Sequence, residues 1–111
     1  MERLHSKFEL LVNAVKNKMG RSYISALAKD LYSSTNTYMN EHRFGGKIRE
    51  NLNVISVHAQ RIWSISKKEI NSPSEEPTRV YEEIYQYIKE IQKEFVAISN
   101  ELKIALREIS L

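Results

Sequence analysis

The apolar residues of the C-terminal part of the chain recur in a heptad spacing. They alternate between steps of four and three residues, and the set comprises Ile84, Ile88, Ile91, Phe95, Ile98, Leu102, Ala105 and Ile109. This period places the side chains on one face of a helix, whereas strand side chains alternate every two residues. The pattern therefore predicts a helix over 78–111, which would be about 50 Å long at 1.5 Å per residue.

Three earlier segments also carry helical spacing. Apolar residues recur every three or four positions over 3–19, 22–40 and 46–70. Between the last of these and the heptad segment lies NSPSEEP, residues 71–77, which is typical of a linker because it holds two prolines and two serines.

Local signals refine these boundaries. Gly20 is a candidate C-terminal stop for the first helix, since glycine takes the left-handed conformation without steric cost. Ser22 is a candidate N-cap for the second helix. The run SSTNT at 33–37 predicts a weak point in that helix, because short polar side chains compete for backbone hydrogen bonds.

Composition supports the same fold class. The chain has 111 residues, which fits one domain spanning 1–111, and its 3 glycines and 2 prolines are too few to punctuate an all-β fold. The prediction is an all-α, up-and-down helical bundle of about four helices with a long heptad-patterned C-terminal helix.

Several classes of protein are not expected. The chain has no cysteine, which excludes disulfides and thiolate chemistry. The charged N-terminal segment does not resemble a secretory signal, and no stretch reaches about 18 apolar residues, so no membrane span is expected. The expected location is intracellular, in the cytoplasm.

The pair Gly45-Gly46 interrupts the helical pattern between basic residues. It lacks the spacing of a Walker loop or of a dinucleotide fingerprint. We interpret it mainly as a break between two helices. An alternative is a weak anion site, because Arg43, Lys47 and Arg49 flank the start of the following helix.

Candidate catalytic and metal-binding groups are sparse. His5 and Glu9 share a helix face, but two ligands are too few for a metal site. His58 lies beside an apolar seam, where a hydrogen-bonded, packed histidine is the expected role. No serine is paired in sequence with a base and an acid. We therefore expect no enzyme, no metal and no cofactor.

Charge is unevenly distributed along the chain. Residues 1–70 hold 12 Lys and Arg against 6 Asp and Glu, a balance of +6, whereas residues 71–111 hold 5 against 8, a balance of −3. In an up-and-down bundle one end of the molecule would gather a basic patch comprising Lys16, Lys18, Arg21, Lys67 and Lys68, with Arg61 one to two turns before it along the third helix. The cations of 43–49 would lie at the opposite end.

Two functional hypotheses follow. The first is a non-enzymatic assembly module, which forms a homo-oligomer or joins a larger protein complex through the seam Ile84, Ile88, Ile91, Phe95, Ile98, Leu102 and Ile109. The second is a small basic accessory subunit of a nucleic-acid-processing complex, which binds the backbone of DNA or RNA without reading its sequence.

Overall fold

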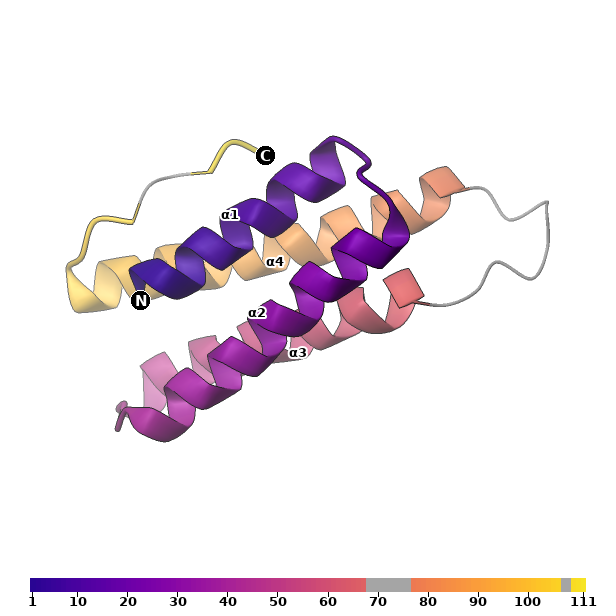
Figure 1. Cartoon of the computed structure of the whole chain (residues 1–111). Coiled ribbons are helices and arrows are strands. Elements are labelled where there is room, and N and C mark those ends of the chain that lie inside the picture. The colour runs from indigo at the N-terminus through magenta and orange to yellow at the C-terminus, as the bar shows by residue number, and fades with distance from the viewer. Residues whose placement is uncertain (68–76, 107–108) are drawn as a thin grey trace.

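The described part of the chain contains four helices and no strand, and its helices run up and down, as predicted (Figure 1). The computed structural model describes residues 1–67, 77–106 and 109–111. Its four helices are α1 (Glu2–Lys16), α2 (Arg21–Glu41), α3 (Gly46–Lys67) and α4 (Pro77–Leu102). The predicted linker is 71–77; its residues 71–76 lie outside the described residues, as do the predicted helical residues 68–70, whereas Pro77 is the first residue of α4.

Successive helices are antiparallel, and α3 packs between α2 and α4 (Figure 1). The helix α1 packs mainly on α2 and makes a smaller contact with α4. Short connections at 17–20 and 42–45 impose this order, because they leave no room for a crossover. The C-terminal end of α1, the N-terminal end of α2 and the C-terminal end of α3 therefore meet at one end of the bundle.

Each helix buries one apolar stripe in a shared core. The aromatic pair Phe8 and Phe95 joins α1 to α4, with ring centroids 5.2 Å apart and the rings stacked. Ile24, Leu31, Leu52 and other fully buried side chains of α2 and α3 fill the space beside it. Burial of this kind supplies the main driving force for folding, at about 1.5–3 kcal/mol for each large apolar side chain.

The heptad residues of α4 belong to this core. Ile84, Ile88, Ile91, Phe95 and Ile98 are at most 1% exposed. Their side chains pack against the chain's own helices and offer no open seam to a partner. The regular spacing is therefore explained by the packing of α4 against the other helices of this bundle.

The predicted helix over 78–111 is wrong in its last turns, because α4 ends at Leu102. Lys103 adopts φ 55°, and the Ile104 amide donates to the Ser99 carbonyl at 3.1 Å, which closes the helix with a Schellman-type bond. We call the described residues 103–106 and 109–111 the C-terminal tail; residues 109–111 lie beside α1 and α4 (Figure 1).

Hydrogen bonds and apolar contacts fix the described part of this tail. Lys16 Nζ donates to the Ser110 carbonyl at 3.0 Å, and the Tyr85 hydroxyl donates to the Leu111 carbonyl. Ile109 is 9% exposed in the tail, whereas Leu102 is 38% exposed at the end of α4. The prediction placed Leu102 and Ile109 on one helical seam, but Ile109 is buried by the tail and Leu102 lies at the exposed end of α4.

The position of α1 explains why α4 stops. The first residues of α1 lie beside Ile104, Ala105 and Leu106, around a hollow between the helix and the tail. A straight continuation of α4 would pass beyond the start of α1 and would leave its apolar residues in water (Figure 1). Turning back lets the tail bury Ile109 instead.

The first helix also ends earlier than predicted, at Lys16 in place of residue 19. The amides of Lys18 and Met19 donate to the carbonyls of Val15 and Ala14, which completes a Schellman motif around Lys18 at φ 48°. Gly20, at φ 101°, is the N-cap of α2, so neither the predicted stop at Gly20 nor the cap at Ser22 is present.

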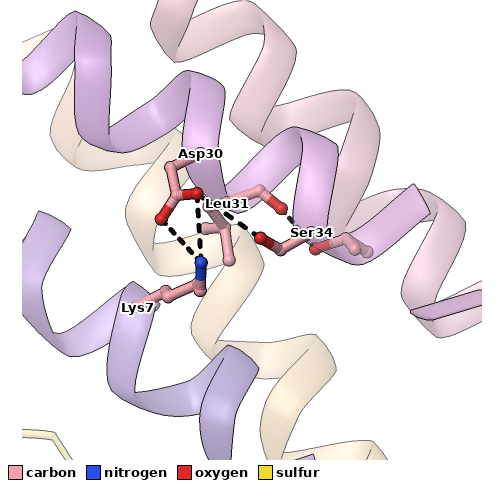
Figure 2. A network of polar contacts seen from close by, with 5 residues as sticks. Lys7, Asp30, Leu31 and Ser34 are labelled. Carbon is pink, nitrogen blue, oxygen red and sulfur yellow. Dashed lines mark hydrogen bonds and ion pairs between the residues drawn. The ribbon is translucent and has the colours of Figure 1, made fainter. Parts of the chain in front are cut away.

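The second helix is continuous through 33–37, so the predicted weak point is absent. The Thr35 hydroxyl donates to the Leu31 carbonyl at 2.7 Å, and the Ser34 hydroxyl donates to Asp30 at 3.5 Å. Asp30 also pairs with Lys7 at 2.8 Å and ties α2 to α1 (Figure 2). These short side chains have partners that leave the helical backbone intact.

Candidate nucleic-acid interface

Two polar stripes run side by side along α2 and α3, next to the buried stripes of these helices. Their residues recur at steps of three and four, so they share one side of the bundle. We call this surface the α2–α3 face; it comprises Ser25, Lys29, Tyr32 and Asn36 of α2 with Arg49, Asn53, Ser56, Gln60, Trp63 and Lys67 of α3. None of these residues is acidic, and three are cations.

Contacts between the two helices hold this face together. The Ser56 hydroxyl donates to Asn36 Oδ1 at 2.8 Å. The rings of Tyr32 and Trp63 stack with centroids 6.3 Å apart. The two helices therefore present a continuous surface, and Arg49 and Lys67 lie about 27 Å apart along it at the helical rise per residue.

Cations gather around Trp63, at the end of the face where α3 finishes. Lys67 Nζ lies 4.5 Å from the Trp63 ring centroid, and Lys29 Nζ lies 5.4 Å from it. Both lysines are exposed, while Trp63 is half-buried and packs partly on the core. We call Lys29, Tyr32, Trp63 and Lys67 the Trp63 cluster.

Other members of the predicted basic patch lie at this end but are engaged elsewhere. Arg21 donates to the Ile65 carbonyl at 2.9 Å, where a cation satisfies the C-terminal end of α3. Lys16 donates to Ser110 in the tail, and Lys18 forms the turn after α1. The bundle end is basic, as predicted, but these side chains also have local structural roles.

Arg61 points away from the predicted patch. Its guanidinium carbon lies 5.9 Å from the ring centroid of Tyr87, on the α4 side of α3. Lys68 lies outside the described residues. Among the described residues of the predicted patch, Lys67 is the member that lies on the α2–α3 face.

The second predicted basic group surrounds the α2–α3 connection at the opposite end of the bundle. Arg43, Lys47 and Arg49 are all exposed there. The helix break predicted at Gly45-Gly46 is confirmed, because α3 begins at Gly46. Arg49 extends the α2–α3 face, so this face carries cations at both ends.

Lys29 does not belong to either of the basic groups predicted from the sequence. It has no basic neighbour in sequence, since Ala28 and Asp30 flank it. A helical projection gives the signal, because Lys29, Tyr32 and Asn36 share one side of α2 at steps of three and four. The pairing with Trp63 depends on the packing of α2 on α3, because Trp63 lies more than 30 residues from Lys29 in sequence.

Negative charge is segregated on the other side of α3. Glu83, Glu90 and Glu94 recur at helical spacing along the edge of α4 that faces α3. The Asn51 side chain donates to Glu94 at 2.6 Å, and the Tyr87 hydroxyl donates to Glu83 at 3.3 Å. The cations of the α2–α3 face are thus separated from this acidic edge by the width of α3.

The histidines have packing roles. His58 Nδ1 donates to the Val54 carbonyl at 2.9 Å, which confirms the predicted hydrogen-bonded role. His5 is buried, and its ring meets Phe95 edge-on at 5.2 Å. No group of three or more metal-ligating side chains occurs among residues 1–67, 77–106 and 109–111.

Two further observations concern the molecule as a whole. No helix within the described residues is long and apolar enough to cross a membrane. A hollow of about 380 Å³ lies between α1 and α2, where Lys7 is already paired with Asp30.

Comparison with protein-family models, with curated proteins and with solved structures finds no match to this chain.

Proposed function

We propose that this chain is a non-enzymatic binding module that contacts the phosphate backbone of a nucleic acid through the α2–α3 face. The observation that carries the proposal is the composition of this face: Lys29, Arg49 and Lys67 lie among neutral hydrogen-bonding side chains without a carboxylate between them. Phosphate oxygens accept hydrogen bonds from lysine, arginine, serine and amide groups of this kind.

The dimensions of the face suit a nucleic-acid strand. The distance of about 27 Å between Arg49 and Lys67 is long enough for the face to reach several phosphates of one strand. Backbone contacts of this kind carry no sequence information. We therefore assign the chain general affinity for nucleic acid and a role as an accessory subunit within a larger complex.

Charge neutralisation supports a measurable affinity. Each phosphate contacted by a cation releases counterions, which gives a salt slope of about −0.7 per contact for single strands. Contacts from Lys29, Arg49 and Lys67 would contribute about −2 to this slope. Removing all three is expected to weaken binding about 10- to 100-fold at about 0.1 M salt.

The test is fluorescence anisotropy with a labelled, mixed-sequence oligonucleotide across a salt series. The triple variant Lys29→Gln, Arg49→Gln, Lys67→Gln should lose most of the affinity and most of the salt slope. The matched control is Arg79→Gln, Lys89→Gln, Lys93→Gln, which removes the same charge from exposed positions of α4. Equal losses in both triples would refute a specific α2–α3 face.

Assembly with a second copy or a larger protein is the other candidate function. The charge separation favours it, because Lys29, Arg49 and Lys67 of one copy would complement Glu83, Glu90 and Glu94 of another. Light scattering of the protein alone tests this idea. A discrete oligomer at low salt that dissociates at high salt would support assembly, and a monomer at both salt concentrations would argue against it.

A further inference from the structure

Trp63 has an environment that its packing role alone does not require. One part of the indole is stacked on Tyr32 and packed on the core, while Lys29 and Lys67 lie over the ring at 5.4 and 4.5 Å. The lysines come from different helices and are both exposed. The half-buried indole ring is thus flanked by two exposed cations.

We propose that the α2–α3 face takes single-stranded nucleic acid, with one unpaired base stacked on Trp63 and the flanking phosphates bound by Lys29 and Lys67. This inference rests on the proposed function and names the form of nucleic acid. The two lysines, which lie over the ring in the free protein, move onto phosphates when a base takes their place.

The exchange of contacts is favourable on general grounds. Stacking of a base on an aromatic side chain exceeds an exposed cation–π contact by roughly twofold to threefold in free energy. The displaced ammonium groups gain charge-assisted hydrogen bonds to phosphate oxygens. Aromatic rings combined with flanking cations are the general means by which proteins hold single strands without reading sequence.

The arrangement disfavours an intact duplex. In a duplex the faces of the bases are covered by their neighbours in the stack, so Trp63 would have no base face to contact. The Trp63 ring is half-buried and stacks on Tyr32 of the neighbouring helix. It does not project as a wedge that could part base pairs. If the protein binds a single strand more tightly than the matching duplex, the difference in affinity indicates stacking of a base on Trp63.

The chain supplies its own probe, because Trp63 is the only tryptophan. Its fluorescence is recorded while an unlabelled single strand of about 15 nucleotides is added, and then with the same sequence as a duplex. We expect saturable quenching by the single strand and none by the duplex. Trp63→Leu should weaken single-strand binding, measured by anisotropy of a labelled strand, by at least about fivefold with an unchanged salt slope.

Control variants separate stacking from loss of structure. Trp63→Phe keeps an aromatic face and should retain most of the affinity, while Tyr23→Leu removes an exposed aromatic ring of α2 outside the α2–α3 face and should change nothing. Thermal melts of each variant establish that it is folded. Quenching in the unaltered protein tests the inference even if Trp63→Leu fails to fold.

The outcomes distinguish this inference from the proposed function. Equal binding of single strand and duplex without quenching would overturn stacking on Trp63 and leave backbone binding by the α2–α3 face intact. Absence of binding to either form at low salt would overturn both. Quenching by the single strand together with loss of affinity in Trp63→Leu would support both.

Discussion

At the scale of single residues, two lysines occupy backbone conformations that favour glycine. Lys18 has φ 48° and Lys103 has φ 55°, each one residue past a helix C-cap. A residue with a β-carbon is strained in this left-handed region, whereas glycine is not. Both positions close Schellman-type turns, so the strain is offset by hydrogen bonds to the last helical carbonyls.

Substitution of Lys18 by glycine is therefore expected to stabilise the protein. Relief of the strain should outweigh the extra flexibility of glycine in the unfolded chain and raise the free energy of unfolding by about 0.5–1 kcal/mol. Urea denaturation measures it. Lys89→Gly, in the middle of α4, is the control and should lower that free energy by about 1 kcal/mol. A decrease in both variants would contradict the turn at Lys18.

Contacts between residues that are close in sequence could be predicted, whereas contacts between distant residues could not. Trp63 and Lys67 are four residues apart, about one helical turn, so the proximity of this pair can be read from the sequence. The carbonyl contacts of Lys16 and Arg21 were not visible, because their partners, Ser110 and Ile65, are distant in the chain.

At the scale of elements, the periodicity of α4 predicted the buried stripe correctly but not the end of the helix. The five heptad positions from Ile84 to Ile98 are all in the core. The spacing continues past Leu102 because the tail also needs apolar residues for packing, and a pattern of apolar residues does not specify the direction of the chain. The turn at Lys103 carries no glycine or proline that would have marked it.

The two outer heptad positions distinguish the folded-back tail from a longer helix. In this structure Ile109→Ala should lower the free energy of unfolding by about 2 kcal/mol, because Ile109 is buried, and Leu102→Ala should lower it by less than about 1 kcal/mol. A helix continuing to residue 111 would place both residues on one seam. Similar effects of the two substitutions, measured by urea denaturation, would therefore argue for that helix.

At the scale of the whole molecule, the up-and-down order followed from short connections and from the length of each periodic segment. It placed the two groups of basic residues at opposite ends, as expected. The division between the basic α2–α3 face and the acidic edge of α4 depends on how each helix is rotated about its axis. That rotation is set by the joint packing of all four helices, which one helix's pattern does not specify.

A carboxylate introduced on α4 should lower the free energy of unfolding strongly on the buried side of the helix and hardly at all on the exposed side. Ile91→Asp buries a carboxylate in the core and is expected to cost more than about 4 kcal/mol, a large part of the stability of about 5–15 kcal/mol typical of such domains. Val96 is 47% exposed, so Val96→Asp should change stability by less than about 0.5 kcal/mol.

Thermal melts followed by circular dichroism at widely separated protein concentrations measure both effects. The melting temperature of the unaltered protein and of Val96→Asp should not depend on concentration if the bundle is stable as a single chain. Strong destabilisation by Val96→Asp, together with a concentration-dependent melt, would place the outer side of α4 in an interface between copies.

The sequential packing of the helices has a consequence for the kinetics of folding. The most extensive helix pair, α2 with α3, joins neighbours in sequence, whereas the contact of Phe8 with Phe95 closes a long loop. Local contacts form early because little chain entropy is lost in closing them. The α2–α3 hairpin is thus the expected nucleus, and the docking of α1 on α4 the expected final step. Weakening the Phe8–Phe95 contact would then accelerate unfolding and leave the refolding rate nearly unchanged.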